Sequence, residues 1–329
     1  MTPSAPRWHV SGGPMPTRFS PFGTDLFGEP AKQDTERGTL ADAYIMPPLS
    51  VLRTDSGRWQ ERKRAWLSHG IRSEIGRGDN LAYNHGGKFR ETTQRGANAD
   101  DGIPGTSIFD PVLCELAYAW WCPPGGRVLD PFAGGSVRGI VAALMGYDYF
   151  GIELRAEQVA ANREQAATIT PDNPPRWVCG DSANVKAEAA GVFDFVFTCP
   201  PYGDLERYSN DPRDLSTMDY ATFRQSLGAI LADCFDLLTA DAFAVVVVGD
   251  IRDERGNYRG FPADVVRMAT DCGLGYYNHA TLVNVIGSKS VTAAANFRFR
   301  KLSKQHQDVL VFIKGDAREV VRRMNEGEA

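Results

Sequence analysis

A regular alternation of strand-forming and helix-forming segments most constrains the fold of this chain, and it begins at about residue 106. Apolar runs typical of buried strands lie at 127–130, 149–153, 176–180, 193–198, 242–249, 275–285 and 307–314. Helix-length segments follow most of them, and another precedes the first, at 111–121, 136–146, 156–168, 219–238 and 261–272. Helical crossovers join parallel strands, so the pattern predicts an α/β fold with a doubly wound, seven-stranded and mostly parallel sheet.

The segments on either side of this alternation divide the chain further. Residues 1–40 are rich in Pro, Gly, Ser and Thr without periodicity, so we expect a mobile tail there. Residues 41–105 form a basic extension, and a domain at 106–315 is followed by a C-terminal helix or tail at 316–329. No internal repeat is evident.

Composition excludes several classes of protein. The chain has 329 residues and 43% hydrophobic content, enough for a large core, but no apolar run of about 18 residues predicts a membrane-spanning helix. The six cysteines form no C-x-x-C pair, so we expect neither a zinc site nor a disulfide framework, and no metal. The N-terminus lacks the apolar core of a signal peptide, and a cytoplasmic location is expected.

The strand at 193–198 ends in the unusual sequence Cys199-Pro200-Pro201-Tyr202. Proline has no backbone N–H to donate to a sheet, so the strand must stop at Cys199. The residue before a proline is held in an extended conformation, which fixes the path of the departing chain. The sequence therefore predicts an aromatic ring at the carboxyl end of a strand, where open α/β sheets bind ligands.

A glycine-containing turn, "VLDPFAGGSVRG", connects the first strand to the next helix, and two later strands also end near an acid. Its spacing does not supply the G-x-G-x-x-G that favours a dinucleotide. Asp130 suits a cationic amine, Glu153 suits a ribose diol, and Asp181 can accept from an adenine amino group. An amine and a ribose together describe S-adenosylmethionine. A nucleotide-binding or ligand-free fold stays open, as does a simple capping role for Asp181.

Taken in order, these motifs resemble those of the amino-methylating DNA methyltransferases, which modify N6 of adenine or N4 of cytosine. "DPFAGGS" resembles the family's cofactor motif D-P-F-x-G-x-G, "FGIEL" its ribose-binding strand, and "CPPY" its catalytic tetrad. "GTSIFDPVLCELAYAWWCPPGG" resembles the segment before the cofactor motif, and "KLSKQHQDVLVFIKG" the last strand. The resemblance covers roughly 106–315, and the layout is also similar to methylases carried by bacteriophages.

The resemblance implies a Rossmann-like class I methyltransferase that uses S-adenosylmethionine and acts on a base flipped out of double-stranded DNA. It assigns the cofactor to Phe109, Asp130, Phe132, Gly134, Gly135, Ser136, Glu153 and Asp181. It assigns catalysis to Cys199, Pro200, Pro201 and Tyr202, with the tyrosine stacked on the flipped base. Two positions depart from the family pattern: Ser136 replaces a glycine, and Cys199 replaces the usual Asp, Asn or Ser.

The cysteine at position 199 leaves three interpretations open. An exocyclic amino group is a weak nucleophile until its N–H groups are accepted, and the first tetrad side chain and the Pro200 carbonyl are the expected acceptors. A thiol accepts only weakly. Cys199 is therefore a serine-like acceptor, a nucleophile for carbon-5 methylation of a pyrimidine, or the mark of a catalytically weakened protein.

Two basic zones are candidates for holding the nucleic-acid backbone, although the net charge of −5 does not by itself suggest such a partner. Arg53–Arg77 carries seven Arg or Lys residues against three acids, with Trp59 and Trp66 on one helical face. Val285–Gln305 carries five cations and no acid. The expected contacts are Arg62, Arg64, Lys289, Arg298, Arg300, Lys301 and Lys304. Such phosphate contacts give affinity rather than sequence choice.

A DNA amino-methyltransferase that uses S-adenosylmethionine is the leading hypothesis, with double-stranded DNA as the partner and no membrane. An RNA or tRNA base methyltransferase is the nearest enzyme alternative, because it would share the pocket. A non-catalytic DNA-binding protein that retains the cofactor is the alternative from another class, and the presence of Asp130, Glu153 and the Pro-Pro-Tyr sequence argues against it. A homodimer stays open.

Overall fold

The computed structural model describes residues 35–72, 75, 109–202, 209, 211–285 and 289–326, without the side chains of 35–39, 289–292 and 326. The chain divides into two compact units, Met1–Pro47 and Pro48–Ala329. In the first unit, helix α1 spans Thr35–Tyr44. The second unit contains every strand of the sheet described below, and all further elements belong to it.

The second unit is built on one mixed sheet with the strand order β1-β7-β8-β6-β5-β2-β3-β4. The strands are β1 (Val51–Arg53), β2 (Arg127–Asp130), β3 (Asp148–Glu153), β4 (Arg176–Cys179), β5 (Phe193–Thr198), β6 (Leu238–Val248), β7 (Gly275–Val283) and β8 (His306–Lys314). Only the pairs that involve β8 are antiparallel in this sheet. The predicted α/β fold with a mostly parallel sheet is confirmed. The predicted number of seven strands is corrected to eight. The additional strand, β1, was missed because it has only three residues and lacks the apolar run that indicates a strand in the sequence.

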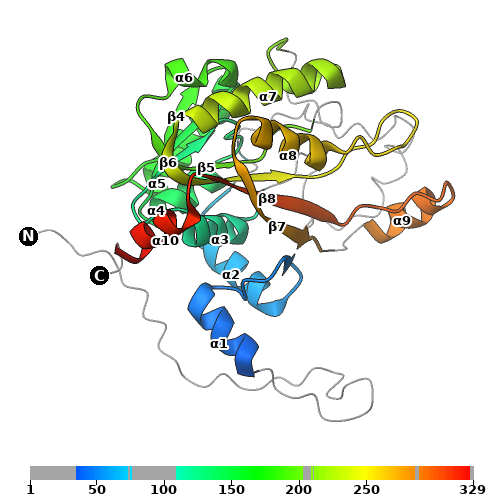
Figure 1. The fold of residues 1–329 in the computed structure, drawn as a ribbon. Coiled ribbons are helices and arrows are strands. Elements are labelled where there is room, and N and C mark those ends of the chain that lie inside the picture. The colour runs from blue at the N-terminus through cyan, green and yellow to red at the C-terminus, as the bar shows by residue number, and fades with distance from the viewer. Residues whose placement is uncertain are drawn as a thin grey trace, which may run out of the picture. The chain divides into compact units, whose positions relative to one another are not determined.

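Helices cover both faces of this sheet. The helices of the second unit are α2 (Gly57–Leu67), α3 (Pro111–Trp121), α4 (Val137–Leu144), α5 (Ala156–Ile169), α6 (Val185–Glu188), α7 (Tyr220–Asp236), α8 (Phe261–Asp271), α9 (Lys289–Phe297) and α10 (Ala317–Glu326). Figure 1 shows α7 and α8 on one face and α3 and α10 on the other. Local chemistry sets the helix starts: the carboxylates of Asp110 and Asp219 cap α3 and α7, and Pro262 lies in the first turn of α8.

The core lies along the two central strands, β5 and β6. Phe193, Phe195 and Phe197 of β5 are inaccessible to solvent, as is the run Ala244–Val248 of β6. Strands buried on both faces need apolar side chains in both directions, which explains why neither strand alternates. Fully burying one such side chain stabilises the fold by about 1.5–3 kcal/mol.

Strand direction decides which segments meet. The parallel strands β2, β3, β4, β5, β6 and β7 all end at one edge of the sheet, which we call the carboxyl edge. Because β8 is antiparallel, with Val283 opposite His306, this strand begins where β7 ends. The connection between β7 and β8 therefore leaves and re-enters the sheet at the carboxyl edge.

None of the helices in the described part of the chain has the length and apolar character of a membrane-spanning segment.

Candidate active site

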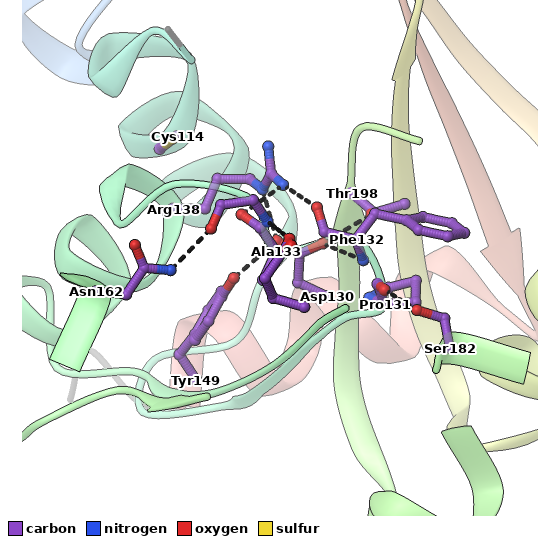
Figure 2. Close-up of polar contacts among 12 residues, drawn as sticks. Cys114, Asp130, Pro131, Phe132, Ala133, Arg138, Tyr149, Asn162, Ser182 and Thr198 are labelled. Carbon is purple, nitrogen blue, oxygen red and sulfur yellow. Dashed lines mark hydrogen bonds and ion pairs between the residues drawn. The ribbon is translucent and has the colours of Figure 1, made fainter. Parts of the chain in front are cut away.

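Asp130, the last residue of β2, is the centre of a buried hydrogen-bond network (Figure 2). Its Oδ1 accepts from the Phe132 backbone N–H at 3.1 Å and from the Thr198 hydroxyl at 2.7 Å. Its Oδ2 accepts from Arg138 Nε at 2.6 Å and from the Tyr149 hydroxyl at 2.7 Å. One inaccessible acid thus ties the ends of β2 and β5 to strand β3 and helix α4.

The charge partner of Asp130 within the protein is Arg138, whose side chain is only 6% exposed. Although burial opposes its charge, the neighbouring carboxylate raises the pKa of the Arg138 guanidinium above its ordinary value. A carboxylate has about four acceptor positions, and the network around Asp130 uses all of them. The geometry therefore favours an indirect role for Asp130, behind the glycine turn, over the expected direct contact with a cationic amine.

At Gly134, the glycine turn has unoccupied space on its outer side. The φ of +52° at Gly134 suits glycine, and a Cβ built there would meet no atom within 4 Å. The backbone is held from both sides: its N–H donates to Glu153 Oε2 at 3.0 Å, and its carbonyl accepts from Asn162 Nδ2 at 2.8 Å. The turn is a fixed backbone cradle with free space in front of it. Gly135 follows as a partly buried bend.

Glu153, at the end of β3, faces this turn with a side chain that is 14% exposed. Its Oε1 accepts from the Arg155 backbone N–H at 3.0 Å, and Arg155 Nε lies 3.8 Å from the same oxygen. Burial raises the pKa of Glu153 above its ordinary value. Each oxygen accepts one backbone hydrogen bond and keeps further acceptor capacity, which suits a pair of hydroxyl groups.

A row of buried amides on α5 supports the turn, and sequence analysis missed it. Gln158, Asn162 and Gln165 follow one another at helical spacing and are at most 8% exposed. Gln165 Nε2 donates to the Arg72 carbonyl at 2.8 Å, and Gln158 Nε2 donates to the Ile75 carbonyl at 3.1 Å. The row therefore connects the glycine turn to the segment that follows α2. Its signal in the sequence is polar residues spaced four and three apart.

Ser136, the departure from the family's glycine pattern, belongs to the same support. Its hydroxyl is buried and donates to Gln165 Oε1 at 3.2 Å. That oxygen also accepts the Arg72 backbone N–H at 2.8 Å. In this chain the serine fastens the start of α4 to α5.

Asp181 follows β4 and caps the short helical turn Ser182–Asn184, because its Oδ1 accepts from the Ala183 backbone N–H at 2.9 Å. The capping alternative is therefore observed. Oδ2 has no protein donor among the described residues, so capping leaves room for a ligand contact. The Ser182 hydroxyl donates to the Pro131 carbonyl, which ties this strand end to the turn after β2 (Figure 2).

Phe109 lies directly before α3 and against the Asp130 network. The Arg138 guanidinium is stacked over its ring at 4.6 Å, and its centroid lies 5.6 Å from that of Phe197. Phe132 packs on the apolar core from the turn itself. Both predicted aromatic residues thus adjoin the same turn.

The Cys199 tetrad begins one residue after Thr198, the hydroxyl that reaches Asp130. Cys199 is partly exposed, with Sγ 3.8 Å from the Tyr202 hydroxyl, and Pro200 is buried while Pro201 is half-buried. The tetrad and the glycine turn therefore occupy adjacent strand ends.

Tyr202 contacts side chains from distant segments that the sequence did not indicate. Its hydroxyl accepts from Gln307 Nε2 at 2.7 Å, and its ring centroid lies 6.4 Å from that of Phe261. Lys304 lies nearby: a Cβ at Gly249 would be 3.5 Å from both Lys304 Nζ and Tyr202 Cε1. Antiparallel β8 brings Gln307 and the preceding Lys304 close to Tyr202. Only the folded structure reveals this contact, because Tyr202 and Gln307 are far apart in the sequence.

Two basic residues of α2, Arg62 and Lys63, form ion pairs within the protein. Arg62 donates to Glu115 on α3, with Nε at 2.8 Å from Oε2, and the Glu115 side chain is 8% exposed. Trp66 Nε1 donates to the same acid at 2.9 Å, and Trp59 Nε1 donates to Asp110 at 3.2 Å. The structure thus gives Arg62, an expected nucleic-acid contact, an intramolecular ion pair with Glu115.

The cations nominated for the nucleic-acid backbone differ in exposure. Arg64 is exposed on α2, while Arg298 and Arg300 are exposed after α9. Lys301 is half-buried, and Lys304 donates to Asp308 at 3.3 Å with only 17% of its side chain exposed. The backbone of Lys289 begins α9, but its side chain lies outside the described residues. In the described part of the chain, no group of three His, Cys, Asp or Glu residues could hold a metal ion.

No protein-family description and no curated protein matches the chain. Solved structures do. The chain is similar to TrmN from Thermus thermophilus, with 16% identity, a TM-score of 0.43, and 63% of this chain and 49% of that chain covered. It therefore spans about half of that protein. It is also similar to a methyltransferase from Pyrococcus furiosus, with 15% identity, a TM-score of 0.44, and 66% and 88% covered.

A third similar structure is magnesium protoporphyrin IX methyltransferase (ChlM) from Synechocystis PCC 6803 with bound SAM, with 14% identity and a TM-score of 0.38. The match covers 58% of this chain and 71% of that one. All three TM-scores are below 0.5.

Proposed function

We propose that the protein is an S-adenosylmethionine-dependent methyltransferase that modifies the exocyclic amino group of adenine or cytosine in DNA. One observation carries the proposal: the 2.7 Å hydrogen bond between Thr198 and Asp130. It fastens the strand end that carries Cys-Pro-Pro-Tyr to the strand end that carries the glycine turn. A methyl donor held by the turn and an acceptor base held by the tetrad would then be neighbours, as direct transfer requires.

The residues around the glycine turn fit this cofactor. S-adenosylmethionine would supply an electrophilic methyl group on a sulfonium ion. Glu153 keeps acceptor capacity for a ribose diol, Asp181 Oδ2 can accept from an adenine amino group, and Gly134 leaves its outer side open. Asp130 and Arg138 would act on the cofactor only by holding the turn in shape.

Cys199 and Pro200 would receive the target amino group. The Pro200 carbonyl can accept one N–H of the amino group, and the Cys199 sulfur can accept the other in a weaker hydrogen bond. Acceptance of both N–H groups localises the nitrogen lone pair and directs it toward the methyl donor. Tyr202 offers a π-face beside this position for an extruded base.

The full chain should be incubated with methyl-labelled S-adenosylmethionine and, separately, with duplex DNA and structured RNA, followed by nucleoside mass spectrometry. We expect N6-methyladenine or N4-methylcytosine in DNA. Methylation of RNA alone would replace the DNA assignment with the RNA alternative. Absence of cofactor binding by calorimetry, with NAD bound instead, would refute the methyltransferase proposal.

Three cysteine variants separate the mechanisms in the same assay. Cys199→Ser should retain activity, because a hydroxyl accepts at least as well as a thiol, whereas Cys199→Ala should lose most of it. Cys272→Ser, at an exposed cysteine after α8, is the matched control. An adduct between Cys199 and 5-fluorocytosine DNA, together with an inactive Cys199→Ser protein that binds the cofactor, would instead establish carbon-5 chemistry.

A further inference from the structure

The segment from Phe297 to Leu302, which we call the tip, presents an uncommon surface at the end of the β7–β8 connection. Phe299 is 77% exposed and Leu302 is 71% exposed, the two highest values among the exposed large apolar residues of the described chain. Phe297 adds a ring that is 50% exposed. Apolar side chains scattered singly on a surface are ordinary, but several within six residues indicate a contact site.

Cations alternate with these apolar side chains in the sequence Phe-Arg-Phe-Arg-Lys-Leu. The Arg300 guanidinium lies over the Phe297 ring at 5.2 Å, and Arg298 is exposed. The whole connection from Val285 to Gln305 contains no acid. A run of cations without an acid attracts a polyanion, and exposed aromatic rings between the cations can stack on bases, so this mixture is complementary to a nucleic acid.

Hydrogen bonds hold the backbone of the tip in a defined conformation, which fixes the positions from which its apolar side chains project. The Lys301 backbone N–H donates to the Asn296 carbonyl at 3.2 Å, and Asn296 Nδ2 donates to Ser303 Oγ at 2.8 Å. Arg252, on the neighbouring turn after β6, donates to the Leu302 carbonyl at 3.5 Å. In Figure 1, α9 lies beyond the ends of β7 and β8.

The tip is close enough to the tetrad to act on the same nucleic acid. Lys304 and the Tyr202 ring both lie against Gly249. Phe299 is five residues from Lys304, so the chain between them spans at most about 17 Å. That is about five steps of 3.4 Å along a nucleic-acid strand.

We propose that Phe299 and Leu302 form an apolar wedge that inserts between stacked bases of duplex DNA near the base that enters the active site. Arg298, Arg300 and Lys301 neutralise the flanking phosphates. Proteins that insert such side chains unstack a base step and bury more of their surface against the bent duplex. The wedge would be a contact between the proposed methyltransferase and its DNA substrate, so this inference rests on the proposed function.

The test uses the full chain and a 30-base-pair DNA duplex with 2-aminopurine beside a central mismatch, because a mismatched base is the easiest to extrude. Binding is followed by anisotropy, and unstacking by 2-aminopurine fluorescence. The double variant F299A/L302A should lose most of the fluorescence increase and bind about tenfold more weakly, with an unchanged salt dependence. Phe299→Trp should retain the fluorescence increase, because tryptophan also offers a ring to stack on a base, and Leu67→Ala, at an exposed leucine of α2, should change neither quantity.

Several outcomes overturn the wedge. One is an unchanged fluorescence increase in F299A/L302A. Another is unstacking of duplex RNA but not of DNA, and a third is a change from dimer to monomer by light scattering without any change on DNA. Calorimetry with S-adenosylmethionine keeps the two proposals apart. A Phe299-dependent signal without cofactor binding refutes only the methyltransferase, whereas full methylation by F299A/L302A with normal unstacking refutes only the wedge.

Discussion

Helix α2 and the tip after α9 have nearly the same charge character in the sequence but differ in the structure. On α2, Arg62 and Lys63 pair with Glu115 and Asp110, acids that lie about 50 residues further along the chain. At the tip, no acid among the described residues pairs with Arg298, Arg300 or Lys301, and Phe297 and Phe299 alternate with the two arginines. A local excess of cations therefore predicts a nucleic-acid contact only when the fold brings no distant acid to it.

The largest effect is expected at Arg138, the most buried of the paired cations among the described residues. Arg138→Ala leaves the Asp130 charge without a partner in an inaccessible position, which should destabilise the fold by about 3–5 kcal/mol. Urea unfolding measures this, with the exposed Arg64→Ala as the control. A variant that unfolds at the wild-type midpoint would show that Asp130 does not depend on the pair.

A smaller loss of stability is expected for Arg62→Ala, about 2 kcal/mol, because Arg62 is one-third exposed while its partner Glu115 is buried. The double variant R62M/E115Q, which removes both charges, should recover much of that loss. DNA affinity should stay unchanged where the variant is folded. If Arg62→Ala is fully stable but weakens the salt dependence of DNA binding, α2 is a DNA contact after all and the comparison fails.

The opposite pattern is expected at the tip. Removing Arg298, Arg300 and Lys301 together should leave the unfolding midpoint unchanged. It should also reduce the slope of log affinity against log salt by up to about 2.7, roughly 0.9 for each phosphate that is no longer neutralised. Titrations at several salt concentrations measure the slope. An unchanged slope would place the DNA elsewhere on the protein.

The smallest effect is expected on the pH dependence of cofactor binding through Glu153. Its cationic partner, Arg155, lies 3.8 Å away, farther than Arg138 lies from Asp130. Burial raises the pKa of Glu153, so on acidification the folded protein takes up this proton before an ordinary carboxyl group does. Cofactor affinity should then fall by up to about tenfold per pH unit below that pKa, because the protonated group loses an acceptor position. The contribution of Glu153 to stability should change oppositely: its charged form is penalised by folding, and that penalty disappears as pH falls. In Glu153→Gln, cofactor affinity should show no such dependence.

The sequence predicted most strands and helices from Pro111 to Lys314 closely because their apolar runs are long and their ends carry prolines, glycines or capping acids, but it missed α6 and α9. It also placed Asp130, Glu153, Asp181 and Cys199 at strand ends, which the sheet order brings to one edge. It could not show that Arg138 turns back to Asp130. Nor could it show that Gln307 reaches Tyr202, since these contacts depend on packing between distant segments. Strand β1 and the docking of α2 on α3 went unseen for the same reason.

The antiparallel course of β8 has an evolutionary consequence. The connection leaves the sheet after Val283 and returns at His306, and these two residues are paired neighbours on β7 and β8. The length of the connection therefore does not constrain the pairing of the strands. Related chains could exchange this connection, or lengthen it, and acquire a different choice of target without redesigning the chemistry. Transplanting residues 284–305 between such chains should carry the target preference with it and leave the catalytic rate nearly intact.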